Sequence, residues 1–149
     1  MTINDAIFRY NLLNTMLFSD GDYSVSRELK VKLIRYKLNF QKIVNEFTET
    51  QKKYIEEVKT PEYNELASKE SRTKEENKNL DKIIQEINSE LNQLINSKLS
   101  EEVETTWYQP LTEDEYNEIL NVNVEHDVEI NGQMIDSTSY VSLLHDYLV

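Results

Sequence analysis

Residues 26–58 decide the fold, and they read SRELKVKLIRYKLNFQKIVNEFTETQKKYIEEV. Apolar residues recur there at alternating steps of four and three, the a/d pattern of a coiled-coil helix about 50 Å long at ~1.5 Å per residue. This seam consists of Leu29, Leu33, Tyr36, Phe40, Ile43, Phe47, Tyr54 and Val58, with Thr50 in the gap. The first half has a second apolar row at Val31, Ile34 and Leu38. We expect an additional N-terminal helix to cover that half, so that it is buried more fully.

A second heptad segment follows a polar linker. Thr60-Pro61 ends the first helix, and Pro61 starts a short helical turn. A capping box at residues 73–76 opens the next helix. Its seam is Leu80, Ile84, Ile87, Leu91, Leu94 and Lys98. Two such segments most simply fold back as an antiparallel helical hairpin within one chain. A seam shared with another chain is the alternative.

The flanking segments are shorter. Residues 3–18 carry apolar residues at helical spacing, with Thr2 as cap and Asp5 three residues on. Asp20-Gly21-Asp22 predicts a turn. Residues 103–107 alternate with period two and predict a strand, while residues 112–120 read as a capped short helix.

Residues 122–130 alternate again and predict a second strand. Asn131-Gly132 then predicts a β-hairpin with a return strand at residues 133–135. A final helix at residues 137–149 has Ser137 or Thr138 as its cap.

These elements predict a mainly α fold. We expect a long antiparallel, coiled-coil-like helical hairpin with a short N-terminal helix and a small C-terminal α/β unit. We place the helical hairpin domain at residues 1–98 and the acidic α/β unit at residues 99–149. So small a unit buries little surface by itself, and we therefore expect it to pack on the base of the hairpin.

Charge is distributed unevenly along the 149 residues. The chain has 16 Lys and Arg and 28 Asp and Glu, a net charge of −12. Residues 26–59 have a net charge of +4 and residues 60–149 of −14, with no Lys or Arg after Lys98. An acidic chain repels phosphate, so we expect no nucleic acid to be read directly. The acidic segment is either a solvated surface or a face that docks on a basic partner, including the basic helix of a neighbouring copy.

Several classes of protein are excluded or disfavoured. Without cysteine there is no disulfide scaffold and no thiolate metal site. The apolar runs are far shorter than the ~20 residues of a membrane span, and the acidic N-terminus differs from a signal peptide. We expect a soluble chain that is not exported. The chain has neither a glycine-rich phosphate loop nor a nucleophile elbow, so we expect no enzyme, no cofactor and no small-molecule substrate.

A row of three carboxylates, Glu125, Asp127 and Glu129, shares one face of the second predicted strand. Carboxylate oxygens suit Ca²⁺ or Mg²⁺, but the spacing and glycine of a calcium loop are missing, so we expect no metal site. His126 and His145 stand outside any metal-ligand motif and are interpreted as surface residues.

Residues proposed to bind a partner fall into three groups. The basic group is Arg27, Lys30, Lys32, Arg35, Lys37 and Lys42. The aromatic group is Trp107, Tyr108 and Tyr116, since aromatic residues anchor interfaces, although they could instead fill the core of the small unit. The acidic group is the carboxylate row. Within the basic group, Lys32, Arg35 and Lys42 could pair with acids of the second heptad helix or of the C-terminal unit.

Three stretches of the chain resemble a family of small tailed-phage proteins encoded among the head and tail morphogenesis genes. They are residues 6–18, the Lys-rich helix that runs into Tyr54-Ile55-Glu56-Glu57, and residues 90–104 leading to a helix with Leu143-Leu144. The resemblance implies a virion component or assembly factor, present in the virion and in the host cytoplasm during assembly. Its partners would be portal, connector, tail or capsid subunits in a homo- or hetero-oligomeric assembly.

The leading hypothesis is therefore a non-enzymatic phage structural protein at the head–tail connector or tail. One alternative is an acidic inhibitor or decoy that targets a nucleic-acid-binding enzyme. Another is a coiled-coil chaperone or adaptor. The order of elements disfavours a prefoldin-like chaperone, because its β-hairpin lies between the two long helices.

Overall fold

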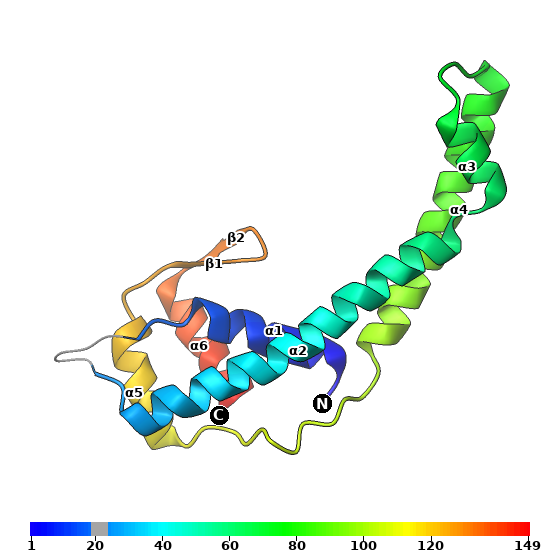
Figure 1. Cartoon of the computed structure of the whole chain (residues 1–149). Coiled ribbons are helices and arrows are strands. Elements are labelled where there is room, and N and C mark those ends of the chain that lie inside the picture. Colours follow the sequence, from blue (N-terminus) through cyan, green and yellow to red (C-terminus); the bar gives the residue numbers. More distant parts are fainter. Residues whose placement is uncertain (19–23) are drawn as a thin grey trace. The chain divides into compact units, whose positions relative to one another are not determined.

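The computed structural model describes residues 1–18 and 24–149, and 71% of these residues are helical. The elements are α1 (Ile3–Thr15), α2 (Arg27–Val58), α3 (Pro61–Ser68), α4 (Lys74–Leu99), α5 (Glu113–Asn123), β1 (Val128–Ile130), β2 (Gln133–Ile135) and α6 (Ser137–Leu148) (Figure 1). The predicted fold class is confirmed: the long helices α2 and α4 are in contact, and a small hairpin and helix follow them.

The chain forms two compact units. Unit 1 is Met1–Val44 with Glu102–Val149, and unit 2 is Asn45–Glu101. The predicted division after residue 98 does not coincide with these units, because the first 44 residues group with the C-terminal third. The reason is a shared core, to which α1, α2, α5 and α6 all contribute buried apolar side chains.

Helix α1 begins where it was predicted and ends earlier. The Thr2 hydroxyl accepts a hydrogen bond from the Asp5 N–H, and the Asp5 carboxylate accepts one from the Thr2 N–H, both at 3.1 Å. The helix ends at Thr15 instead of residue 18, because Met16 is extended and both backbone groups of Leu17 bind the Asn123 side chain. The predicted turn at residues 20–22 lies outside the described residues.

Helix α2 has the predicted seam but not the predicted cover. Leu29, Leu33, Tyr36 and Phe40 are buried in the core of unit 1. The expectation that the second row would also be buried is wrong, since Val31, Ile34 and Leu38 are exposed by 40%, 49% and 53%. Helix α1 packs into the core beside the seam, together with α5 and α6, and therefore only borders the second row.

Unit 2 is an antiparallel arrangement within one chain. The capping box at Thr73 starts α4 as predicted, and Pro61 is the first residue of the short helix α3. Near the end of α4, Lys98 lies within electrostatic range of Glu46, whereas Ile84 near its start faces Ile55 of α2 across a small pocket. The two helices therefore run in opposite directions, as in the predicted hairpin.

The strand predicted at residues 103–107 is absent from the structure. Thr2 forms a single bridge with Glu102, just before this segment, and the Val103 N–H donates to the Met1 carbonyl oxygen, but residues 103–107 pair with no strand among the described residues. The Tyr108 N–H donates to the Thr105 carbonyl oxygen in a turn. The ring of Trp107 lies 4.8 Å from that of Phe40, centre to centre. Alternation in sequence makes a strand only where another strand lies alongside, and here the neighbouring elements are helices.

In the last third, the predicted β-turn is confirmed and the second predicted strand is shorter than expected. Helix α5 starts at the predicted capping box but extends to Asn123, so the second predicted strand is reduced to β1. Strand β1 pairs antiparallel with β2 through Asn131 and Gly132, whose φ angles of 53° and 76° suit the predicted two-residue turn. Helix α6 is capped by Asp136 instead of Ser137 or Thr138.

Candidate functional site

The exposed apolar row of α2, hereafter the α2 row, consists of Val31, Ile34 and Leu38. Steps of three and four place these side chains on one helical face. All three are at least 40% exposed, although they lie on the same helix as the buried seam. Single exposed apolar residues are normal on a protein surface, whereas a contiguous set on one helix is typical of a binding face.

A groove borders the α2 row on the side of α1. It has a volume of about 440 Å³, and Leu13 and Met16 line it opposite Ile34 and Leu38. Phe18, which is itself exposed, lines the groove and also a neighbouring hollow of about 290 Å³. Ile34 and Leu38 of the row therefore line a groove on unit 1, and Phe18 lies between this groove and the neighbouring hollow.

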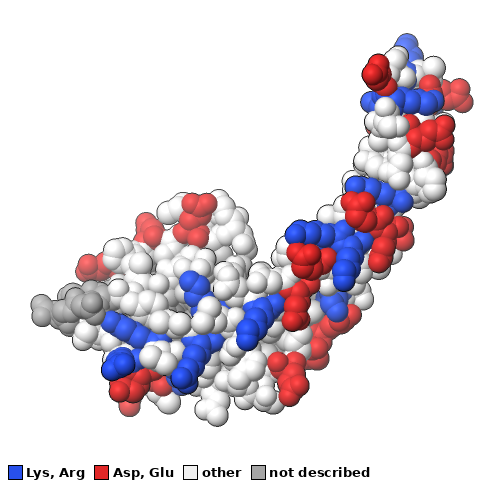
Figure 2. All heavy atoms as spheres, viewed as in Figure 1, with Lys and Arg blue, Asp and Glu red and all other residues white. Residues whose placement is uncertain are grey.

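Cationic residues flank the α2 row on both sides. At 3.6 residues per turn, Lys30 and Lys37 lie along one edge, and Arg35 and Lys42 lie along the other. Lys37 also lines the groove, and Arg27, Glu28 and Val31 line a shallow hollow at the start of the helix. Figure 2 shows Lys and Arg side chains following the first half of α2 across the face in view. Five of the six predicted basic residues thus surround an apolar strip.

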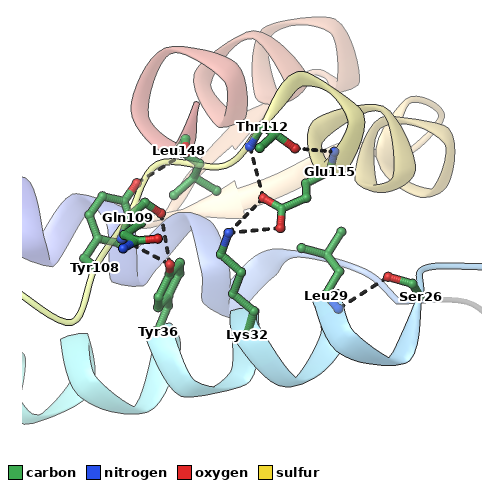
Figure 3. Close-up of polar contacts among 9 residues, drawn as sticks. All are labelled: Ser26, Leu29, Lys32, Tyr36, Tyr108, Gln109, Thr112, Glu115 and Leu148. Carbon is green, nitrogen blue, oxygen red and sulfur yellow. Dashed lines mark hydrogen bonds and ion pairs between the residues drawn. The ribbon is translucent and has the colours of Figure 1, made fainter.

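The sixth basic residue, Lys32, has a different role. Its ammonium group contacts both carboxylate oxygens of Glu115, at 2.8 and 3.0 Å, which confirms for Lys32 the predicted pairing with a C-terminal acid (Figure 3). Partial burial acts to raise the pKa of Glu115, but hydrogen bonds from Lys32 and from the Thr112 N–H hold that pKa below its ordinary value. Lys32 therefore joins α2 to α5 within the chain.

The predicted aromatic residues lie inside unit 1. The hydroxyl of Tyr36 donates to the Gln109 carbonyl oxygen and accepts from the Gln109 N–H (Figure 3). The rings of Trp107 and Tyr108 lie beside that of Tyr36, at 6.0 and 5.0 Å between ring centres. Burial raises the pKa of Tyr108, whose hydroxyl donates to the Tyr147 carbonyl oxygen. These contacts support the alternative that the aromatic residues fill the core.

Tyr116 is likewise a core residue. Its ring is buried in α5, and its hydroxyl donates to the Val141 carbonyl oxygen of α6 at 2.9 Å. Burial raises the pKa of Tyr116. Tyr116 therefore links α5 to α6.

The carboxylate row does not share one strand face. Glu125 and Asp127 precede β1 and only Glu129 lies on it, although all three residues are exposed. Asp127 accepts a hydrogen bond from the Ser137 N–H at 3.0 Å and so orients the start of α6. Within residues 1–18 and 24–149, no group of three or more His, Asp or Glu side chains is arranged to hold a metal ion.

Both histidines lie at the surface, as predicted. His126 is exposed beside the hollow that Phe18 lines. The His145 Nε2 atom lies 3.1 Å from a Glu113 carboxylate oxygen, and the ring packs edge-on against Tyr116.

Two buried polar side chains were not anticipated from sequence. Asn123 is fully buried and binds the backbone of Leu17, and Tyr140 is fully buried with its hydroxyl donating to the Leu12 carbonyl oxygen at 2.8 Å. The exposure of the α2 row differs from the sequence-based expectation that this row is buried. The sequence does contain a signal for the exposure of this row, namely the cations on both of its edges. Cations are solvated more readily at a surface than in an interior, so their positions favour an exposed row.

Comparisons of the chain with protein-family models, with curated proteins and with solved structures give no match. Of the helices in the described ranges, none has both the length and the apolar character that crossing a lipid bilayer requires.

Proposed function

We propose that this chain is a non-enzymatic structural or assembly protein of a tailed-phage virion, at the head–tail connector or in the tail, and that it acts through protein–protein contacts. The resemblance to small phage morphogenesis proteins supports the virion part of the proposal. The α2 row supports the protein–protein part, and it is the observation that carries the proposal. In this view the chain resides in the host cytoplasm during assembly and in the finished particle.

The α2 row exposes apolar surface that a partner can remove from water. Burying apolar area stabilises a complex by roughly 25 cal/mol per Å², and such surfaces rimmed by polar groups commonly mark interaction sites. Leu33 and Tyr36 on the opposite side of the same helix are buried in the core of unit 1. The row is therefore held on a helix that is already anchored, so binding costs little additional ordering.

Polar contacts inside unit 1 add to this anchoring. The Lys32–Glu115 ion pair joins α2 to α5, and the Tyr36 hydroxyl joins α2 to Gln109. These residues serve the fold of the chain itself. They support an interpretation in which unit 1 is a rigid platform for the α2 row.

The test uses particles of the phage whose genome encodes the chain. We expect peptides of the chain in gradient-purified particles or assembly intermediates, at a constant ratio to the portal subunit. The double variant Ile34→Ser/Leu38→Ser should be lost from the particles, while Met134→Ser, which changes an exposed apolar residue on β2, should be retained. Absence of the chain from particles and from all intermediates would contradict the proposal, as would normal incorporation of the double variant.

A further inference from the structure

We infer that the α2 row and its adjoining groove bind an acidic amphipathic helix of a different protein, an inference that rests on the proposed function and names the partner's chemistry.

The shape of the site fits a helix. Val31, Ile34 and Leu38 span two helical turns, or roughly 10 Å along the axis of α2 at ~1.5 Å per residue. The groove between α1 and α2 lies directly beside them and shares Ile34 and Leu38 as lining residues. An amphipathic helix binds such a surface by laying apolar residues at i, i+3 and i+7 into the groove.

The charge of the site selects an acidic partner. Arg35, Lys37 and Lys42 form no ion pair with any residue in the described part of the chain. A helix seated on the row brings its own flanking positions close to these cations. Acidic residues at those positions attract them, as in the paired edges of a coiled coil, and basic residues repel them.

A second copy of this chain is a poor occupant. Pairing two α2 rows brings the cations of both copies together, which destabilises the contact. The other exposed large apolar side chains in the described residues are Leu17, Phe18, Ile55, Ile84, Val124 and Met134. They do not form a three-residue row on an acidic helix, so a copy has no matching element. The complement therefore comes from another protein.

Binding of synthetic peptides to the full chain tests this inference. The probe is a fluorescent helical peptide of about 18 residues with leucine at its a and d positions and glutamate at the flanking positions. The comparison peptide has lysine in place of each glutamate. By anisotropy at about 0.05 M salt we expect the glutamate peptide to bind at least about tenfold more tightly, with a smaller difference at about 0.5 M.

Variants of the chain locate the binding. Ile34→Ser/Leu38→Ser should weaken binding of the glutamate peptide by about tenfold or more, and the matched control Met134→Ser should leave it unchanged. The triple variant Arg35→Glu/Lys37→Glu/Lys42→Glu should bind the lysine peptide more tightly than the glutamate peptide. Because the chain is acidic overall, with a net charge of −12, circular dichroism should also show native helical content in this variant, so that the reversed preference is not a property of a misfolded acidic chain.

Three outcomes overturn the inference: failure of the glutamate peptide to bind, equal affinity for both peptides, or full binding by the double serine variant. Light scattering gives a fourth such outcome. If the native chain is a dimer and Ile34→Ser/Leu38→Ser makes it a monomer, a second copy of the chain occupies the row. In each of these cases the proposed function is still supported if the native chain is incorporated into particles and the double serine variant is not. Conversely, selective peptide binding by a chain absent from particles and intermediates contradicts the proposed function alone.

Discussion

Replacing Asn123 with aspartate tests the packing of α1 against α5. The Asn123 side chain is fully buried and makes three hydrogen bonds with the described part of the chain. Its Oδ1 atom accepts from the Leu17 N–H at 2.9 Å, and its Nδ2 atom donates to the carbonyl oxygens of Ile119 and Leu17 at 2.8 and 3.3 Å. Asn123→Asp keeps the shape of the side chain but turns a carboxylate oxygen toward those two carbonyl oxygens.

The expected cost follows from these contacts. A protonated aspartic acid can still donate one hydrogen bond, so one bond is lost at a cost of about 1 kcal/mol. Burial and the two carbonyl oxygens raise the pKa of the new carboxyl group in the folded chain. At a pH where the group is ionised in both the folded and the unfolded chain, a rise of about two pKa units lowers the free energy of unfolding by about 2.7 kcal/mol. We therefore expect the free energy of unfolding to fall by about 3–4 kcal/mol at about pH 7.

The sign of the pH dependence is fixed by the raised pKa. Between the pKa of the new carboxyl group in the unfolded chain and its higher pKa in the folded chain, the folded variant binds more protons than the unfolded variant. The variant therefore loses stability relative to the native chain as the pH rises through this range. Urea unfolding followed by circular dichroism should show that the difference shrinks to about 1–1.5 kcal/mol at about pH 4.

The matched control is Asn121→Asp, an exposed position in the same last turn of α5. It places the same negative charge near the same helix end, so the helix dipole affects both variants alike. Equal stability of the two variants at neutral pH would refute the buried amide contacts. A difference that stays constant with pH would show that a buried charge is not its cause.

Three further predictions concern single residues in unit 1. Tyr140→Phe removes the hydrogen bond that the hydroxyl donates to the Leu12 carbonyl oxygen and the one that it accepts from the Thr15 hydroxyl, and should cost about 1–2 kcal/mol. Because burial raises the pKa of Tyr140 to about 12, the native chain should lose more stability than this variant as the pH rises from about 10 toward 12, and an equal loss in urea unfolding would contradict this. Gly132→Ala should cost about 1 kcal/mol and lower the melting temperature by a few degrees, because φ at this position is 76°, a value that favours glycine. A methyl group would meet no other atom there, so an unchanged melting temperature would contradict the turn geometry. Glu115→Gln should make stability less dependent on pH, because the lowered pKa of Glu115 stabilises the native chain at pH values above 4.5, the ordinary pKa of the group, and this contribution is lost as the pH falls. If the native chain and the variant lost equal stability between about pH 6 and about pH 3, the result would argue against the Lys32 contact.

The helices, and the starting points of α1, α4 and α5, were predictable because the responsible interactions are local. Thr2, Thr73 and Thr112 each bind a backbone N–H three residues ahead in a capping box, as their sequences predicted. The turn at Asn131 and Gly132 depends in the same way on two adjacent residues. Where the ends of elements depend on distant residues, prediction failed: α1 stops early because Asn123 binds Leu17, more than a hundred positions before it.

The candidate site was predictable in part. The sequence identified the basic residues of α2, and all of them except Lys32 flank the exposed row. It did not show that the row itself is exposed. Of the predicted aromatic residues, Tyr116 lies in the core and Trp107 and Tyr108 pack against it partly buried, which the sequence did not show because an interface anchor and a core residue have the same side-chain chemistry and differ only in what covers them.

The sequence by itself determined the long helices, the capping boxes and the hairpin turn, since each depends on residues within about one helical turn or one β-turn. Only the tertiary structure decided which apolar residues are covered. Periodicity shows that Leu33 and Ile34 both lie on apolar faces of α2, but their burial depends on where α1, α5 and α6 lie. The same holds for residues 103–107, which have the alternation of a strand but only helices as neighbours.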